Sequence, residues 1–217
     1  MNFIFGTGGF AKEVDWLIHE IHNFKGDDYT PHYYVAEHTS SLVGQSLNGR
    51  EVISESSFRE RFLGGAHNCF IAVGSPSIKE KIVLQLKSHM KNCTFPNLIH
   101  PNVLYDRRFG KLVLGEGNII CGGCILTTDI LLKNFVHLNL GTTVGHDTII
   151  GDYATISPKV AVSGNVCIGD RVFLGTGSNV LERLVISSDI VVGASATVIT
   201  DLYEPGTYVG TPARRTN

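Results

Sequence analysis

Residues 144–168 read VGHDTI-IGDYAT-ISPKVA-VSGNVC-I, so that an aliphatic residue opens each block of six. The same spacing holds without exception from Leu114 to Val198. The fifth position of each block is usually small or aliphatic, as at Ala154 and Val166. An α-helix repeats every 3.6 residues and a strand every two, so neither demands a period of six. This period is typical of a parallel β-helix, in which three hexapeptides close one triangular coil.

The aliphatic anchors predict about five coils, which at a strand spacing of roughly 4.8 Å make a prism on the order of 24 Å tall. Each coil buries its inner face only because its neighbours cover it. Glycine often follows the anchor, so we expect the corners to turn on small residues. The anchors are Leu114, Ile120, Leu126, Leu132, Leu138, Val144, Ile150, Ile156, Val162, Ile168, Leu174, Val180, Ile186, Val192 and Val198.

The segment before the repeats has a different pattern, with apolar runs and helical spacing in alternation. A strand, a glycine loop, a helix and a second strand begin a βαβ unit, which predicts a small α/β domain with parallel strands. We expect this domain over residues 1–96, the β-helix over 97–203 and a turn-rich tail over 204–217. The expected elements are strands at 2–5, 32–36 and 69–73, and helices at 10–22 and 78–90.

Gly6, Gly8 and Ala11 fit the G-x-G-x-x-G/A pattern between a strand and a helix. Such a loop leaves backbone N–H groups at a helix N-terminus, which is a seat for a phosphate. Glu37, at the end of the next strand, is placed to accept a ribose hydroxyl. Fewer than a hundred residues precede the β-helix, so we expect one nucleotide diphosphate rather than NAD. The alternative is a tight turn that binds no ligand.

His146 lies two residues after the anchor Val144, at an outward position, and Asp147 follows it directly. A carboxylate beside an imidazole orients the ring and stabilises its charged form. His146 is therefore a candidate general base for a nucleophile that attacks an acyl group. The alternative is an ordinary surface histidine.

The composition excludes several classes of partner. A net charge of −2 gives no indication of a nucleic-acid partner, and 18% charged residues is low enough to favour self-association. The N-terminus lacks a basic leader, and no apolar run is long enough to span a membrane, so we expect a cytoplasmic protein without membrane contact. Cys121 and Cys124 form a CxxC without a second pair, and both fit the hexapeptide register, so we expect no metal.

The chain resembles the hexapeptide-repeat acyltransferases, and among them the two-domain sugar acetyltransferases. These include sialic acid O-acetyltransferases and N-acetyltransferases of nucleotide-linked 4-amino-sugars, such as the bacillosamine-pathway enzyme. The resemblance covers nearly the whole chain. It rests on the opening Phe3–Gly9 (FIFGTGG), on Val144–Tyr153 (VGHDTIIGDY), on Ser163–Gly169 (SGNVCIG) and on Val209–Ala213 (VGTPA).

The resemblance implies a Rossmann-like half domain followed by a left-handed parallel β-helix, in a homotrimer with active sites between adjacent prisms. It implies acetyl-CoA along the prism and a nucleotide-linked sugar held by the N-terminal domain. His146 matches the general base and Asp147 the residue that orients it. The residues expected to contact the substrate are Gly8, Gly9, Phe10, Glu37, Gly74 and Asn139. The residues expected along the cofactor path are Gly164, Thr176 and Ala194.

Two positions depart from the family pattern. Many relatives have histidine where this chain has Phe10 and where it has Thr155, which leaves His146 as the sole plausible base and the sugar undefined. The expected activity is direct acetyl transfer to a sugar amine, with the Gly164 N–H polarising the thioester oxygen. The alternatives are O-acetylation of sialic acid or another sugar, a non-catalytic sugar-nucleotide-binding protein, and a dinucleotide-dependent enzyme.

Overall fold

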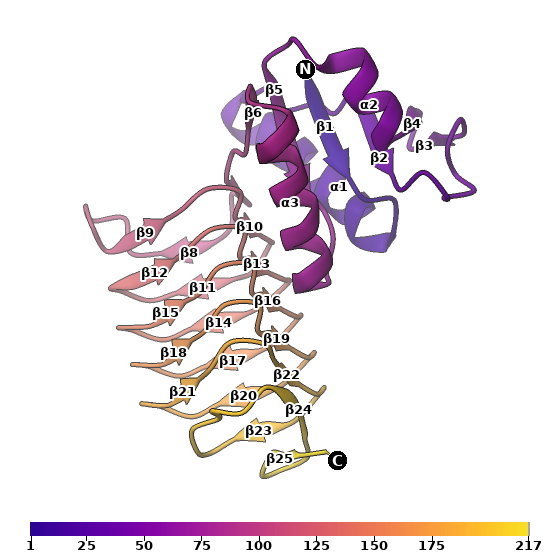
Figure 1. Cartoon of the computed structure of the whole chain (residues 1–217). Helices are drawn as coiled ribbons and strands as arrows, with labels where there is room; N and C mark the ends of the chain where they lie inside the picture. The colour runs from indigo at the N-terminus through magenta and orange to yellow at the C-terminus, as the bar shows by residue number, and fades with distance from the viewer. Residues whose placement is uncertain (217) are drawn as a thin grey trace. The chain divides into compact units, whose positions relative to one another are not determined.

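The computed structural model describes residues 1–216 and divides the chain into two compact units, Met1–Leu98 and a second unit that begins at Ile99. Figure 1 labels their elements in chain order, from indigo at the N-terminus to yellow at the C-terminus. The strand β7 (Leu98–Ile99) lies at the boundary. Among residues 1–216, no helix has the length and apolar character needed to cross a membrane.

The first unit is a doubly wound α/β sheet. Its six strands lie in the order β3-β4-β2-β1-β5-β6, and all pairs are parallel except the β3–β4 hairpin. The parallel strands therefore follow the order 3-2-1-4-5 in chain sequence, with β1 at the point where the winding reverses. The strands are β1 (Asn2–Phe5), β2 (Tyr33–Ala36), β3 (Ser46–Leu47), β4 (Arg50–Ser54), β5 (His67–Ile71) and β6 (Cys93–Thr94).

Three helices accompany this sheet: α1 (Gly9–Lys25), α2 (Glu55–Phe62) and α3 (Pro76–His89). The α1 helix continues three residues beyond the expected end at His22 and stops where Gly26 adopts a left-handed φ of 77°. The sequence analysis did not predict the β4–α2 segment. Its local signal is nonetheless present: Ser54 caps α2 by accepting a hydrogen bond from the Ser57 N–H at 3.1 Å.

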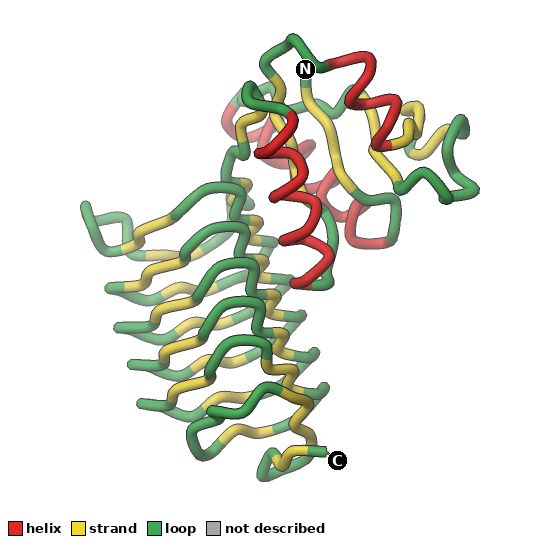
Figure 2. Tube along the Cα trace, in the orientation of Figure 1, coloured by secondary structure: helices red, strands yellow, loops and turns green. Residues whose placement is uncertain are grey.

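The second unit is the left-handed parallel β-helix that the hexapeptide period predicts. Figure 2 shows its short strands stacked in coils and separated by turns. Successive coils pair in parallel at a separation of 18 residues, as for Thr143 with Ala161 and Ile149 with Cys167. Three hexapeptides per coil are therefore confirmed.

The strands form three flat faces of the prism. The first face contains β10 (Ile119–Ile120), β13 (His137–Leu138), β16 (Thr155–Ile156), β19 (Phe173–Leu174), β22 (Ile190–Val192) and β24 (Gly206–Val209). The second face contains β8 (Leu104–Tyr105), β11 (Ile125–Leu126), β14 (Thr143–Val144), β17 (Ala161–Val162), β20 (Asn179–Val180) and β23 (Thr197–Val198). The third face contains β9 (Leu112–Leu114), β12 (Ile130–Leu132), β15 (Ile149–Ile150), β18 (Cys167–Ile168) and β21 (Val185–Ile186).

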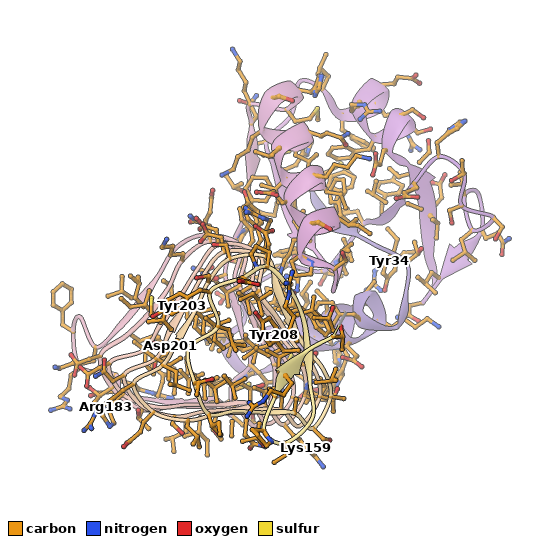
Figure 3. The ribbon with its side chains drawn as sticks, turned by 60° about the horizontal axis from the view of Figure 1, so that its bottom comes forward. Tyr34, Lys159, Arg183, Asp201, Tyr203 and Tyr208 are labelled. Carbon is orange, nitrogen blue, oxygen red and sulfur yellow. The ribbon has the colours of Figure 1, made fainter. Side chains whose placement is uncertain are left out.

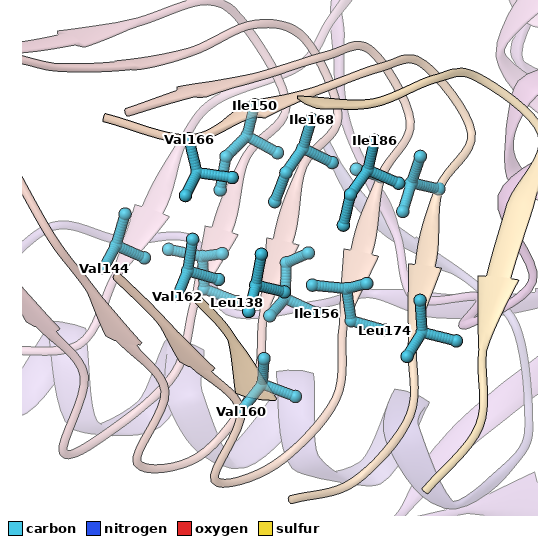
Figure 4. Packing of buried hydrophobic residues seen from close by; sticks show 14 of the residues in the cluster. Leu138, Val144, Ile150, Ile156, Val160, Val162, Val166, Ile168, Leu174 and Ile186 are labelled. Atoms are coloured by element: carbon cyan, nitrogen blue, oxygen red, sulfur yellow. The ribbon is translucent and has the colours of Figure 1, made fainter. Parts of the chain in front are cut away.

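The anchors form the core of the prism. All of them except Leu114 are buried, and Figure 4 shows rows of them on successive coils, such as Ile150, Ile168 and Ile186. Each row is continuous because an anchor packs on the equivalent residue of the coils on either side. The β-helix is thus stabilised chiefly by contacts at one fixed sequence separation.

The corners turn differently from the sequence expectation. The residue three positions after each anchor from Leu114 to Val192 has the left-handed φ, and most of these residues are not glycine. The non-glycine residues are Asp129, Phe135, Asp147, Tyr153, Lys159, Asn165, Arg171, Arg183, Asp189 and Ser195; the glycines are Gly117, Gly123, Gly141 and Gly177.

Glycine is required directly after several anchors for another reason: the next coil approaches the backbone closely at these positions. A Cβ on Gly151 would lie 2.5 Å from Asp170 Oδ1, and one on Gly175 would lie 2.6 Å from the Ala194 nitrogen. Real Cβ atoms do not make such contacts, so a glycine is needed wherever backbone stacks this tightly. The small residues therefore permit stacking rather than turning.

Residues 204–216 contribute two strands to the prism. The strand β24 pairs in parallel with β22 and antiparallel with β25 (Arg214–Arg215). Tyr208 and Ala213 join the buried cluster of the β-helix. The last turn therefore closes the open end of the apolar core.

Candidate active site

His146 lies at the corner between the second and third faces, directly after β14. We call this corner 2/3; it also carries Asp147, Gly164, Asn165 and Arg183 on successive coils. The side chains of His146 and Asp147 are 59% and 61% exposed, so both are accessible to a ligand.

The imidazole is oriented by its neighbour in sequence. Its Nδ1 lies 2.7 Å from Asp147 Oδ2. When the carboxylate accepts this hydrogen bond, the proton lies on Nδ1 and the lone pair on Nε2. The left-handed φ of 58° at Asp147 belongs to the repeating corner geometry. The fold therefore determines the backbone position from which this carboxylate side chain extends.

Two glycines bring the next coil against the imidazole. A Cβ on Gly164 would lie 2.6 Å from His146 Nε2 and 2.7 Å from Cε1, and one on Gly145 would lie 2.5 Å from the Gly164 nitrogen. His146 and Gly164 are also tied together by the coil backbone, because the Asn165 N–H donates to the His146 carbonyl oxygen at 2.6 Å. Among residues 1–216, the Gly164 N–H donates no hydrogen bond. The imidazole edge that carries Nε2 therefore packs against Gly164 of the next coil.

A single chain does not bring all the expected residues together. Asn139, Thr176 and Ala194 follow strands of the first face, so they lie at the corner between the first and second faces, which we call corner 1/2. Figure 3 shows the two corners apart, with Arg183 marking corner 2/3 and Lys159 marking corner 1/2. Asn139 is 8% exposed, whereas Thr176 and Ala194 are exposed. The second face separates these three residues from His146.

The first unit holds a cavity of about 300 Å³ at the carboxyl ends of its parallel strands. Gly6 and Thr7 follow β1, Glu37 follows β2, and Glu55 follows β4. This is the place where a doubly wound sheet binds ligands. The cavity therefore includes the glycine loop and Glu37 of the sequence prediction and adds Glu55, which the sequence analysis missed.

The remaining residues of the glycine loop border the start of α1. Gly8 is the N-cap of α1 and has no side-chain cap hydrogen bond, and both Gly8 and Gly9 are exposed. Phe10 occupies the first turn of α1 and is partly exposed, and Gly74 lies between β5 and α3. Open backbone N–H groups at a helix N-terminus fit a phosphate. Contacts of these residues with a substrate stay predictions.

Side chains of His, Cys, Asp and Glu do not gather into a metal-binding group of three or more within residues 1–216. The cysteines Cys121 and Cys124 are both buried, and the Cys124 thiol lies 3.1 Å from the Asn139 carbonyl oxygen. Burial raises the pKa of Cys124 to about 11, which holds it in the thiol form.

Comparison with known proteins finds similarity along both units. No protein-family model matches the chain. GDP-perosamine N-acetyltransferase of Escherichia coli O157:H7 is 29% identical over 195 residues, which cover 88% of this chain and 82% of that protein.

Two solved structures are similar over nearly their whole length. A histidine-to-asparagine variant of perosamine N-acetyltransferase from Caulobacter crescentus, in complex with CoA and GDP-perosamine, has a TM-score of 0.87 at 26% identity and covers 99% of this chain and 96% of that one. The acetyltransferase domain of PglB from Neisseria gonorrhoeae FA1090, in complex with acetyl coenzyme A, has a TM-score of 0.84 at 25% identity and covers 99% of this chain and 98% of that one.

Proposed function

The chain belongs to the hexapeptide-repeat sugar acetyltransferases with a left-handed β-helix, and from this premise we propose that it acetylates the amine of a nucleotide-linked sugar. The co-substrate is acetyl-CoA. The names of the E. coli and C. crescentus relatives, both perosamine N-acetyltransferases, support an amine on a nucleotide-linked sugar as acceptor. The observation that carries the proposal is the His146–Asp147 pair, exposed at a corner and packed against Gly164 of the next coil.

The proposed reaction is a direct transfer in a ternary complex. The amine nitrogen attacks the thioester carbonyl, the new C–N bond forms and the C–S bond breaks. His146 Nε2 accepts the proton that the amine loses and passes it to the departing CoA thiolate. The Asp147 carboxylate stabilises the resulting imidazolium, and the Gly164 N–H donates to the oxygen that gains negative charge.

We further propose a homotrimer in which each active site lies between two chains. One chain separates His146 from Asn139 by the whole second face, so a substrate that contacts both must lie between two copies. The outward residues of the third face support association, because they form an apolar column across five coils: Val113, Leu131, Ile149, Cys167 and Val185. A head-to-tail interface of this kind closes a ring when the rotation is 120°.

The product would enter the biosynthesis of a bacterial surface polysaccharide or glycan, and we propose the cytoplasm as the site of the reaction. All five cysteines are free, which suits a reducing compartment.

The test is release of CoA thiol from acetyl-CoA with a panel of nucleotide-linked amino-sugars, and with free sialic acid as the comparator. We expect turnover with one or more nucleotide-linked amines and none with the free sugar. Turnover with sialic acid alone would move the assignment to O-acetylation. No turnover with any acceptor, while acetyl-CoA and nucleotides still bind, would support a non-catalytic binding protein instead.

A further inference from the structure

The cavity of the first unit has mostly apolar walls and a few polar side chains. Its walls come from both sides of β1: Val35 and Ala36 on β2, and Val73, Ile78 and Ile82 after β5 and in α3. Thr7, Glu37, Ser40 and Glu55 are the polar side chains of its lining, which contains no lysine or arginine. Because two carboxylates repel a phosphate, the phosphates belong outside, at the α1 N-terminus, and the nucleobase belongs inside.

The order of the strands gives Glu37 and Glu55 different positions along a bound nucleotide. A nucleotide in a doubly wound sheet places its phosphates at the loop after the first strand and its ribose against the acidic residue that ends the second. Here that acidic residue is Glu37, directly after β2. Glu55 directly follows β4, the next strand outward in the sheet order, so it lies one strand farther from β1 than Glu37, on the side of the cavity that is left for the base.

Glu55 starts α2 under the Ser54 cap, which gives its backbone a defined place at the rim of the cavity. Its side chain is partly buried. A carboxylate only accepts hydrogen bonds, and it binds best where two donors lie side by side. The nucleobases differ in whether they present two adjacent hydrogen-bond donors.

Guanine presents its N1–H and its 2-amino group next to each other, which matches both oxygens of one carboxylate. Uracil and thymine present one N3–H between two carbonyl oxygens, which a carboxylate repels. Adenine and cytosine present one amino group beside an acceptor nitrogen. We infer that Glu55 recognises the nucleobase by a two-point hydrogen bond and selects a guanine nucleotide. This inference deepens the proposed function and rests on its nucleotide-linked acceptor.

The first experiment needs no variant: calorimetric titration of the full chain with GDP, IDP, UDP, ADP and CDP. GDP should bind most tightly, on the order of 10- to 100-fold more tightly than UDP, which is the range of one charge-assisted hydrogen-bonded pair. IDP retains N1–H and lacks the 2-amino group, so its affinity should fall between those of GDP and UDP. A preference for UDP, or equal binding of GDP and IDP, would overturn the inference.

The second experiment uses Glu55→Gln with Glu37→Gln as the matched control. Glu55→Gln should abolish the preference for GDP over IDP, because one oxygen acceptor becomes an amide donor. Glu37→Gln should weaken the binding of GDP and of IDP by the same factor, because Glu37 contacts the ribose that both share. The ratio of the two affinities should therefore be preserved. An unchanged GDP-to-IDP ratio in Glu55→Gln, with unchanged melting temperature, would also overturn the assignment.

These outcomes separate the inference from the proposed function. Preference for another base overturns the role of Glu55 and leaves acetyl transfer to a nucleotide-linked amine intact. Absence of binding by all five nucleotides overturns both the inference and the nucleotide-linked acceptor.

Discussion

The geometry of single residues at corner 2/3 explains why the imidazole is available for chemistry. Asp147 Oδ2 lies 2.7 Å from His146 Nδ1, and the absence of a side chain at Gly164 leaves space for the Nε2 edge of the same ring. Neither residue contributes to the apolar core. Their replacement should therefore separate activity from stability.

Replacement of His146 by alanine removes the proposed base. Because the side chain is 59% exposed, the prism should remain folded. Turnover should fall roughly 10²- to 10⁴-fold, the usual contribution of general base catalysis. The measurement is kcat by CoA thiol release, with thermal unfolding as the control. Wild-type turnover in this variant would exclude the mechanism.

Replacement of Gly164 by alanine should displace the imidazole, since the added Cβ would lie 2.6 Å from Nε2. We expect a loss of kcat at least tenfold, because the base moves from the reacting amine. The control is Gly122→Ala, whose added Cβ meets only ordinary contacts at 3.4 Å or more. Equal activity of the two variants would show that the position of the ring does not depend on Gly164.

The Cys69–Cys93 pair allows a test by pH. The Cys69 thiol donates to Cys93 Sγ at 3.3 Å, and this hydrogen bond holds the pKa of Cys93 below its usual value. Cys93 should therefore react with iodoacetamide at lower pH than an ordinary thiol, because the thiolate is the nucleophile.

Removal of the donor by Cys69→Ala should raise the pKa of Cys93 and shift its rate profile to higher pH, as read by mass spectrometry of the labelled peptide. Cys69→Ser keeps a hydroxyl donor and should retain much of the effect. The same profile in wild type and Cys69→Ala would contradict this account.

At the scale of elements, a side-chain ladder holds the coils together at the corner between the third and first faces. Asp170 Oδ1 accepts from the Asp152 N–H at 2.8 Å, and Ser188 Oγ accepts from the Asp170 N–H at 3.0 Å. Asp152 Oδ1 accepts from both the N–H and the side-chain amide of Asn134, each at 2.8 Å. Each side chain thus satisfies a backbone donor of the coil before it.

Replacement of Asp152 by alanine should leave two donors of Asn134 without this acceptor. We expect a loss of about 1–3 kcal/mol in the free energy of unfolding. Thermal or denaturant unfolding measures it, and the exposed Glu182→Ala, expected within about 0.5 kcal/mol of wild type, is the control. An Asp152→Ala protein as stable as wild type would show that the ladder contributes no net stability.

At the scale of the whole molecule, the apolar column of the third face predicts assembly. A charge at its centre should prevent association, so Ile149→Glu should be monomeric and nearly inactive. Ile149 is 40% exposed in one chain, and Val191 is 38% exposed on the first face. The matched control is therefore Val191→Glu, which should leave the mass of the assembly unchanged. Light scattering after size-exclusion chromatography measures the mass. A trimeric Ile149→Glu protein would refute the role of this face.

Assembly also predicts complementation between inactive chains. Co-expressed His146→Ala and Asn139→Ala chains should regain activity, because about a quarter of the interfaces in random trimers combine two intact residues. Each variant alone is the control. Failure to regain activity in verified mixed trimers would place both residues in one chain's site or remove Asn139 from it.

The β-helix could be predicted because its contacts recur at a separation of 18 residues, so the sequence alone reveals which residues stack. The same register identified His146 and Asp147 as outward neighbours. It could not reveal why Gly145 and Gly164 are glycines, because the approach of one coil to the next depends on backbone geometry. The sequence analysis also expected the corners to turn on small residues, whereas the left-handed φ lies three residues after each anchor and mostly on residues other than glycine.

The α/β unit was predicted less completely, because its contacts join distant and unequally spaced segments. Asn2 pairs with Asn68, and Cys69 meets Cys93, at separations that no repeat encodes. The sequence by itself therefore determined the fold class, the family resemblance and the candidate base. Only the tertiary structure placed Glu55 in the same cavity as Glu37 and separated His146 from Asn139. The physical reason is that periodic packing is local information, whereas a cavity arises where the ends of separate strands converge.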